Sequence, residues 1–324
     1  MDERSSSERN RAPYFSAHPR SFADFRYVYP VVSRRAGGIS LGVNLNLDQR
    51  CNFHCIYCQV QRTDLPTQAS AADRPTSSVA LSGEPSAGES CPAAQGGQNR
   101  FIDLDRLAAE LESVFQMWQS GRLFTIRPFS DLPPQLRRLN DIALSGDGEP
   151  TLYRNFPEIV ACCAEVRRRH RLEDLKLVLI TNASLLDQPY VQEGLDLLAQ
   201  NNGEIWAKLD AGTEEYFRQV ARSPVPFERI LRNIQQAARR WPVVIQSLFM
   251  RIAGCGPSPD EQAAYCRRLK EIVEAGGQIK LVQIYTIARP PAEPIVSALA
   301  TQELQAIAAL VRQTTGLPVA VFPA

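Results

Sequence analysis

Short apolar runs alternate along the chain with longer segments in which apolar residues recur every three or four positions. The β-branched runs predict six strands, at 42–47, 141–145, 176–182, 204–210, 243–251 and 278–287. The segments of helical period predict six helices, at 103–119, 156–170, 187–200, 227–240, 259–275 and 301–313. This alternation is typical of parallel strands joined by crossover helices. The pattern therefore predicts an α/β fold, either a doubly wound sheet or a partial TIM-type barrel.

Two stretches interrupt this pattern. Residues 1–36 form a polar, arginine-rich lead-in, and residues 63–100 are rich in Ser, Ala, Pro, Gly and Gln. The second stretch has too few large apolar residues to order itself by burial. We therefore expect an N-terminal extension at 1–36 and one domain at 37–324, with a disordered low-complexity insert at about 64–100.

Composition and charge narrow the class of protein. The 36 Lys and Arg residues nearly balance the 35 Asp and Glu residues, so no global field would gather nucleic acid or an anionic membrane. The polar N-terminus is unlike a signal peptide, and no apolar run reaches the roughly 18–20 residues of a membrane span. We expect a cytoplasmic protein with no membrane partner. Its eight cysteines would then serve metal or redox chemistry rather than disulfides, if they cluster.

Three cysteines do cluster, just after the first predicted strand. Cys51, Cys55 and Cys58 have a Cys-x3-Cys-x2-Cys spacing that lets three thiolates converge from one loop. Three cysteines would leave one iron of a four-iron cubane without a protein ligand. A zinc site needs a fourth ligand. No second Cys-x2-Cys or His pair follows, and we interpret His54 as a loop histidine rather than that ligand. The other cysteines are scattered, which predicts one cluster of about four iron atoms.

Polar and glycine residues gather where the later strands end. The second predicted strand is followed by Gly146-Asp147-Gly148-Glu149, the third ends at Asn182, and the fourth carries Lys208 and Asp210. The carboxyl ends of parallel strands meet at one edge of a sheet or barrel, so these residues should surround one site. Glycines there would permit close approach of a small zwitterion.

Two cationic residues near these strand ends leave two interpretations open. Strand periodicity places Trp206, Lys208 and Asp210 on one inward face, so Lys208 is either a catalytic group or half of a structural ion pair. Arg289 follows the last predicted strand, where it either contacts an anionic part of a substrate or is a solvated loop residue.

The cysteine triplet, with Tyr57 before its last cysteine, resembles the signature of the radical S-adenosylmethionine (SAM) superfamily. The resemblance implies the partial (β/α)6 TIM-type barrel of that superfamily. It implies a [4Fe-4S] cluster on the three cysteines, whose open iron binds SAM and whose electron cleaves it to a 5′-deoxyadenosyl radical. It also implies an electron donor of the flavodoxin or ferredoxin type. The cofactor contacts that it implies are Tyr57, Gly146, Asp147, Gly148, Glu149, Asn182 and Asp210.

Within the superfamily, the chain is most similar to the Fe–S oxidoreductase branch that includes the wyosine-base synthases of transfer RNA. That similarity depends on five segments: Asn-Leu-Asn-Leu before the triplet, Tyr57-Cys58-Gln59 within it, Ser145-Gly-Asp-Gly-Glu-Pro-Thr, Lys208-Leu-Asp210-Ala, and Arg289-Pro290. Those synthases carry further upstream cysteines for a second cluster, whereas no cysteine precedes Cys51 here. We expect an oxidoreductase or lyase-type radical SAM enzyme acting on an unidentified small molecule or RNA. The alternatives are a tRNA-modifying wyosine-type synthase, a glycyl-radical activase and a non-catalytic zinc-binding interaction module.

Overall fold

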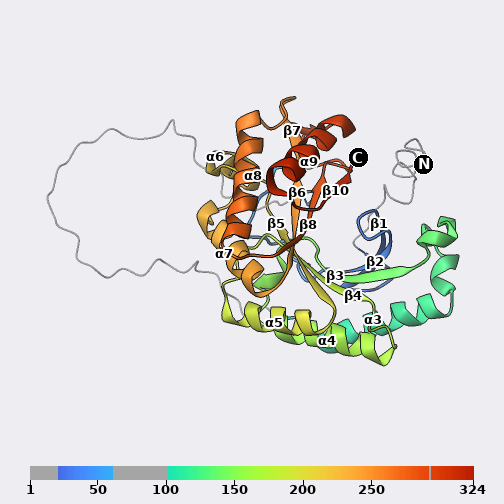
Figure 1. The fold of residues 1–324 in the computed structure, drawn as a ribbon. Coiled ribbons are helices and arrows are strands. Elements are labelled where there is room, and N and C mark those ends of the chain that lie inside the picture. The colour runs from blue at the N-terminus through green and yellow to red at the C-terminus, as the bar shows by residue number, and fades with distance from the viewer. Residues whose placement is uncertain (1–20, 61–100, 292) are drawn as a thin grey trace, which may run out of the picture.

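A single curled sheet organises the computed structural model, which describes residues 21–60, 101–291 and 293–324 (Figure 1). Its eight strands lie in the order β1-β2-β3-β4-β5-β6-β8-β10, and every neighbouring pair is parallel except β1 with β2. The strands are β1 (Val28–Ser33), β2 (Gly38–Val43), β3 (Leu139–Leu144), β4 (Lys176–Thr181), β5 (Gly203–Lys208), β6 (Val243–Leu248), β8 (Ile279–Tyr285) and β10 (Val319–Phe322). The curled parallel sheet confirms the predicted partial barrel. The predicted insert at 64–100 lies outside the described residues.

Helices cover the outer face of this half-barrel (Figure 1). The α-helices are α3 (Leu104–Gln119), α4 (Phe156–Arg169), α5 (Pro189–Gln200), α6 (Glu214–Ala221), α7 (Phe227–Arg240), α8 (Pro259–Glu274) and α9 (Thr301–Thr315). Short 3-10 helices lie at η1 (Arg122–Thr125), η2 (Phe129–Asp131), η3 (Pro134–Leu136) and η4 (Pro150–Leu152). Side-chain caps fix several starts, since Asp103 accepts from the amide of Arg106 and Ser258 from that of Glu261. All six predicted helices are present to within about two residues, and α6 is an addition.

The period-two pattern of the strands divides the interior into two sides. On β5 and just after it, Ile205, Ala207 and Leu209 face the helices in the main core, as predicted. The opposite face carries a separate apolar layer inside the barrel, formed by Ala143, Val178, Trp206 and Val244. This layer separates the two ends of the barrel interior, so that groups at the carboxyl ends of the strands form a compartment of their own.

The first predicted strand was placed too late in the chain. The strand β2 occupies Gly38–Val43 rather than 42–47, and its partner β1 was not predicted because its residues were assigned to the polar lead-in. The Glu110 carboxylate, which is 3% exposed, anchors β1 by accepting from the amides of Arg26, Tyr27 and Val28. A short apolar run near several arginines thus becomes a strand because it pairs with β2 and because a distant helix residue, Glu110, anchors its start.

The end of the chain departs from the predictions in a similar way. The predicted strand at 243–251 is two strands, since Phe249 separates β6 from β7 (Met250–Ile252). The strand β7 pairs antiparallel with β9 (Val296–Ala298) in a second small sheet. Neither β9 nor β10 was predicted. None of the helices in the described part of the chain has the length and apolar character that a membrane crossing would require.

Candidate active site

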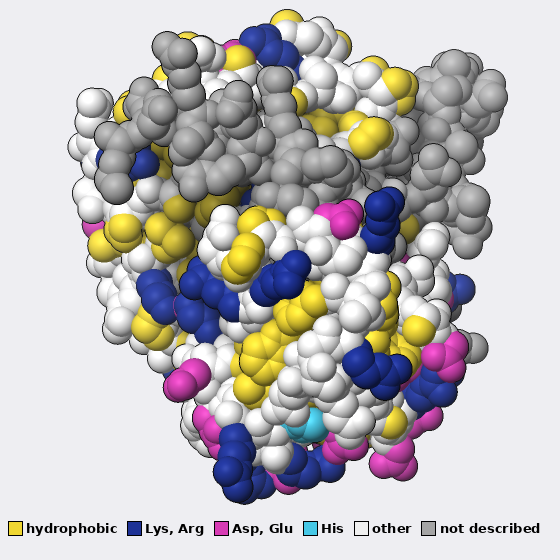
Figure 2. All heavy atoms as spheres, turned by 90° about the vertical axis from the view of Figure 1, so that its right-hand side faces the viewer, with side chains coloured by type: hydrophobic (Ala, Val, Ile, Leu, Met, Phe, Trp, Pro, Cys, Tyr) yellow, Lys and Arg dark blue, Asp and Glu magenta, His cyan; other side chains and the backbone are white. Residues whose placement is uncertain are grey.

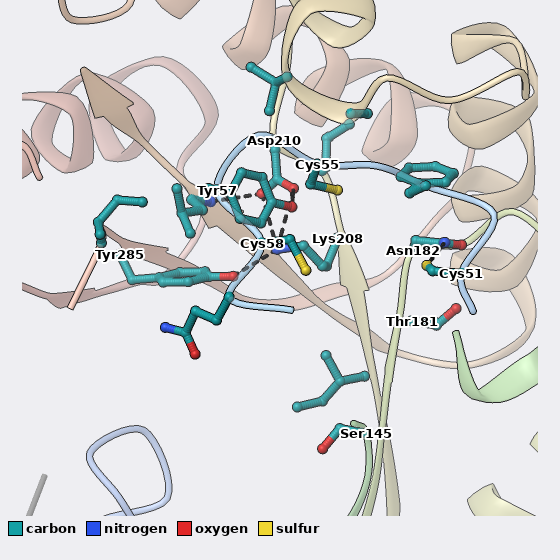
Figure 3. A pocket seen from close by; sticks show the side chains of 18 of the residues that line it. Cys51, Cys55, Tyr57, Cys58, Ser145, Thr181, Asn182, Lys208, Asp210 and Tyr285 are labelled. Carbon is teal, nitrogen blue, oxygen red and sulfur yellow. Dashed lines mark hydrogen bonds and ion pairs between the residues drawn. The ribbon is translucent and has the colours of Figure 1, made fainter. Parts of the chain in front are cut away.

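A cavity of about 320 Å³ lies at the carboxyl ends of the strands. Its wall includes all three cysteines of the triplet and residues that follow β3, β4, β5 and β8 (Figure 3). The turn between β1 and β2 completes the wall from the edge of the sheet. The residues predicted at the strand ends therefore lie around this one cavity, except for Asp147, which is not in its wall.

The cysteine loop is fixed by its backbone and by the apolar residues between the cysteines. The amide of His54 donates to the carbonyl of Ala221, and the amide of Ile56 donates to the carbonyl of Val220, both at 3.0 Å. These are the last two carbonyls of α6. The Ile56 side chain is buried in a small cluster with Val220 and residues of β6, β7 and β9, and Phe53 packs edge-on against Phe217. The unpredicted helix α6 is therefore the main support of the loop.

The thiols fit an iron–sulfur cluster by their chemistry and exposure. All three are half-buried, none forms a disulfide, and each lines the cavity. Burial raises the pKa of the Cys55 thiol to about 12, so binding of a metal centre there must displace a proton. No three His, Cys, Asp or Glu side chains of the described residues converge as ligands of a single ion. In a cubane, by contrast, each cysteine binds a different iron.

A chain of polar contacts ties the cysteine loop to β5 and β8 (Figure 3). The Tyr57 hydroxyl donates to Asp210 Oδ2 at 2.5 Å, and the amide of Leu248 donates to Asp210 Oδ1 at 2.8 Å. Lys208 Nζ lies 3.3 Å from the same carboxylate and donates to the Tyr285 hydroxyl at 2.7 Å. Both oxygens of Asp210 therefore accept hydrogen bonds from the protein, which leaves fewer acceptor positions for its predicted contact with the cofactor.

These contacts also set the charge of the network. Burial raises the pKa of the Tyr57 hydroxyl well above its ordinary value, and the Asp210 carboxylate raises it further. Burial lowers the pKa of Lys208, but Asp210 and Tyr285 raise it more, so the net pKa lies above the ordinary value. Lys208 thus forms an ion pair with Asp210 in the wall of the cavity, and its catalytic role stays a prediction.

Glu149 joins the ends of β3 and β4 beneath the cavity. Its carboxylate, 2% exposed, accepts from the hydroxyls of Thr151 and Thr181 and from the amide of Asn182 at 2.6 to 2.7 Å. Burial raises its pKa, against the effect of these hydrogen bonds. The Asn182 side chain in turn donates to Asn52 at 2.8 Å beside Cys51. Glu149 thus orients Asn182 towards the cysteine loop.

Close packing explains why glycines follow β3, which the sequence did not reveal. A Cβ on Gly146 would lie 2.2 Å from Asn44 Oδ1, and one on Gly148 would lie 2.2 Å from the carbonyl oxygen of Arg50. Neither glycine has a positive φ. They are required because the β3 loop presses against the segment that leads into Cys51, and this contact brings the two loops to one wall of the cavity.

Two of the predicted site residues lie at the margin of the cavity. Asp147 is not part of its wall, and its carboxylate accepts from the Asn44 side chain at 2.7 Å. Arg289 lines the cavity and donates to Gln59 at 3.0 Å. The sequence missed Arg34 and Arg35 in the β1–β2 turn, which also line it. The signal was present as Arg-Arg-Ala-Gly-Gly between two apolar runs, a hairpin pattern.

Two curated proteins resemble parts of this sequence. The UPF0026 protein slr1464 of Synechocystis sp. is 27% identical over 214 residues, which cover 65% of this chain and 59% of that protein. The GTPase Obg of Brachyspira hyodysenteriae is 22% identical over 281 residues, which cover 85% of this chain and 32% of that protein. The chain thus spans 59% and 32% of the length of these two relatives.

Solved structures support the fold. A radical SAM methyltransferase from Sphaerobacter thermophilus aligns with a TM-score of 0.54 at 12% identity, covering 92% of this chain and 69% of the other. SuiB of Streptococcus suis, solved bound to S-adenosylmethionine, aligns with a TM-score of 0.51 at 11% identity, covering 89% and 52%. TYW1 structures align with TM-scores below 0.5, so the wyosine-synthase branch stays a prediction.

The family model decides the superfamily. The model described as "Radical SAM superfamily" matches residues 45–264, a span that begins before the cysteine triplet and includes β3 to β7 with their helices. The chain therefore belongs to the radical SAM superfamily, whose enzymes use a [4Fe-4S] cluster and S-adenosylmethionine.

Proposed function

We propose that Cys51, Cys55 and Cys58 hold a [4Fe-4S] cluster and that the protein cleaves S-adenosylmethionine reductively to act on a substrate. The observation that carries the proposal is that three cysteines of one loop line the same cavity as the strand-end loops after β3, β4 and β5. When bound, the cluster supplies the electron that cleaves the cofactor to a 5′-deoxyadenosyl radical.

The residues around the thiols divide into direct contacts and positioning groups. We assign cofactor contacts to Gly146, Gly148 and Asn182, which line the cavity beside Cys51. Glu149 and Asp210 are positioning residues, since their carboxylate oxygens already accept hydrogen bonds from the protein. Asp147 positions the β3 loop through Asn44 in the same way.

The remaining predicted groups act on the position of the loop and at the margin of the cavity. Tyr57 is held by Asp210, which fixes the loop between Cys55 and Cys58. Lys208 keeps its proton and its positive charge between the rings of Tyr57 and Tyr285, at 5.0 and 5.3 Å from their centroids. Arg289 lies where a substrate group can reach it. Radical SAM enzymes need a reductant, and we propose a donor of the flavodoxin or ferredoxin type for an oxidoreductase or lyase-type reaction.

Anaerobic protein reconstituted with iron and sulfide tests this proposal directly. With dithionite and S-adenosylmethionine, it should release 5′-deoxyadenosine, measured by chromatography and mass spectrometry, and should contain about four iron atoms per chain. Cys58→Ala should lower both values to near zero. Cys162→Ala is the matched control, because that thiol lies on α4 and contacts the carbonyl of Leu104 outside the cavity. Cluster-loaded protein that releases no 5′-deoxyadenosine, or a colourless protein with stoichiometric zinc, would contradict the proposal.

A further inference from the structure

The cavity wall carries more positive than negative charge. Among the described residues that line it, the cations are Arg34, Arg35, Lys208 and Arg289, and the carboxylates are Glu149 and Asp210. Both carboxylates are engaged by hydrogen bonds from other parts of the protein. Lys208 is neutralised by Asp210, which leaves the two arginines of the β1–β2 turn without a carboxylate of the wall to pair with.

The two arginines are held in place by other means. Arg34 donates to the carbonyl of Pro323 just beyond β10, so the turn is joined to the opposite edge of the sheet. The Arg35 guanidinium lies 5.0 Å from the centroid of the Tyr285 ring and 5.9 Å from that of Trp206. Cation–π contacts of this kind orient a guanidinium without consuming its N–H donors.

No carboxylate of the described residues, 21–60, 101–291 and 293–324, forms a salt bridge with either arginine. The Asp141 carboxylate interacts with Arg35 at longer range, and its own hydrogen bond comes from Ser40. Burial and the neighbouring Arg35 both lower the pKa of Arg34. Two like charges held together in a partly buried wall are a ready site for an anion, because an anion offsets their repulsion and desolvation.

The arginine pair lies towards one end of the cavity. Figure 3 places Tyr285, on which Arg35 packs, on the far side of Lys208 from Cys51 and Asn182. Phe322 of β10 adds an apolar wall next to the pair. On the face of the molecule drawn in Figure 2, Lys and Arg side chains group near the centre beside exposed apolar ones, and basic and acidic side chains both lie along the lower edge. An anion in the cavity would meet the two guanidinium groups at the end away from Cys51 and Asn182.

We propose that Arg34 and Arg35 bind an oxyanion, a carboxylate or a phosphate, of the substrate, at the end of the cavity away from Cys51 and Asn182. This inference rests on the proposed function, since it describes the substrate of that site. Guanidinium groups match both oxyanions by paired N–H donors. The pair would fix the substrate so that its uncharged part extends along the apolar wall towards the cysteines.

Isothermal calorimetry on the cluster-loaded full chain tests the inference with two probes, tripolyphosphate and tricarballylate. At least one should bind in a saturable way, and the stronger probe identifies the oxyanion. Arg35→Gln and Arg34→Gln should each weaken that binding at least tenfold, and Arg35→Lys should restore only part of it because the planar fork is lost. Arg138→Gln is the matched control. This substitution also removes one positive charge beside the β1–β2 turn, but Arg138 lies outside the cavity wall. It should bind as the unaltered protein does.

Three results would overturn the inference. They are no saturable binding of either probe, an equal loss in Arg138→Gln, and an Arg35→Gln variant whose affinity for S-adenosylmethionine falls as much as its affinity for the probe. Melting curves of each variant exclude loss by unfolding. Release of 5′-deoxyadenosine by the unaltered protein is measured separately. If the protein releases 5′-deoxyadenosine but binds neither probe, only this inference is overturned. If it binds a probe but releases no 5′-deoxyadenosine, only the proposed function is overturned.

Discussion

The two ends of the barrel use the same strand in different ways. At the amino end of β5, Glu204 accepts hydrogen bonds from Lys176 at 2.7 Å, Lys280 at 2.6 Å and the Trp206 indole at 3.0 Å. At the carboxyl end, Asp210 accepts from Tyr57, Lys208 and the amide of Leu248. The apolar layer that contains Trp206 separates the two groups. Each end therefore has a carboxylate with three donors, on one face of one chain segment.

The difference lies in what the donors are and how exposed they are. The lysines that pair with Glu204 are 46% and 56% exposed, so water screens these ion pairs and their contribution to stability is small. Lys208 and Asp210 are 18% and 12% exposed, and the other donors to Asp210 belong to the cysteine loop and β6. Similar carboxylate contacts thus add a little stability at one end and position a site at the other, as expected for a barrel whose functional loops follow the strands.

Removing each carboxylate should separate these two roles. Asp210→Ala should lower the free energy of unfolding by about 3–5 kcal/mol, because it leaves the buried Lys208 ammonium without its partner. It should also reduce iron content, since Tyr57 loses its anchor beside Cys55 and Cys58. Glu204→Gln should cost only about 1 kcal/mol and leave iron content unchanged. Urea unfolding and iron analysis measure both effects.

The comparison would fail if Glu204→Gln lost as much iron as Asp210→Ala, or if Asp210→Ala kept its full iron content. Tyr57→Phe sharpens the test, because it removes only the hydroxyl that donates to Asp210 and leaves the Lys208 ion pair intact. The Tyr57→Phe variant should lose less stability than Asp210→Ala, and it should also retain less iron than the unaltered protein.

A smaller effect should follow from a methyl group at the site end. Gly148→Ala places a Cβ 2.2 Å from the carbonyl oxygen of Arg50, so the backbone ahead of Cys51 must shift. We expect a loss of about 1–3 kcal/mol in the free energy of unfolding, with faster cluster loss in a chelator challenge. Gly256→Ala is the control, because its nearest contact would be an ordinary 3.4 Å and its φ is not positive. Equal behaviour of the two variants would show that the β3 loop does not press on the cysteine segment.

The smallest effects are pH dependences at the amino end, where two carboxyls should act in opposite directions. Despite the effect of burial, which raises it, Lys176 and Lys280 lower the pKa of Glu204 from 4.5 to about 2. Its contribution to stability is therefore complete above pH 4.5 and is lost as the pH falls towards 2. Burial raises the pKa of Asp141 from 3.8 to about 6, so the folded state binds a proton there that the unfolded state releases. Its effect makes the free energy of unfolding fall as the pH rises from 3.8 to 6.

Urea unfolding at a series of pH values checks both signs. Glu204→Gln should flatten the profile below pH 4.5, and Asp141→Asn should flatten it between pH 3.8 and 6, each by an amount of the order of 1 kcal/mol. A profile of Asp141→Asn that matches the unaltered protein in that range would show that this carboxyl is not the source.

The sequence by itself determined the repeating elements and the chemistry of the cysteines. Helix periodicity and caps are local, so α7 was predicted at its observed bounds, and strand alternation correctly separated Lys208 from Leu209 by face. Three thiols within eight residues are also a local signal, because they can converge without help from distant parts of the chain. The alternation of strands and helices predicted an α/β fold, and the resemblance of the cysteine triplet to a known family implied the partial barrel.

Only the tertiary structure decided which partners the polar side chains have. Glu149 and Asp210 were predicted as cofactor contacts because of where they occur, and in the fold their oxygens also accept hydrogen bonds from residues more than 30 positions away. Arg34 and Arg35 were assigned to a polar lead-in, and they reach the cavity because β1 pairs with β2 and Glu110 anchors its start. Hydrogen-bond partners and counter-ions depend on contacts between distant segments, which hydrophobic periodicity cannot specify.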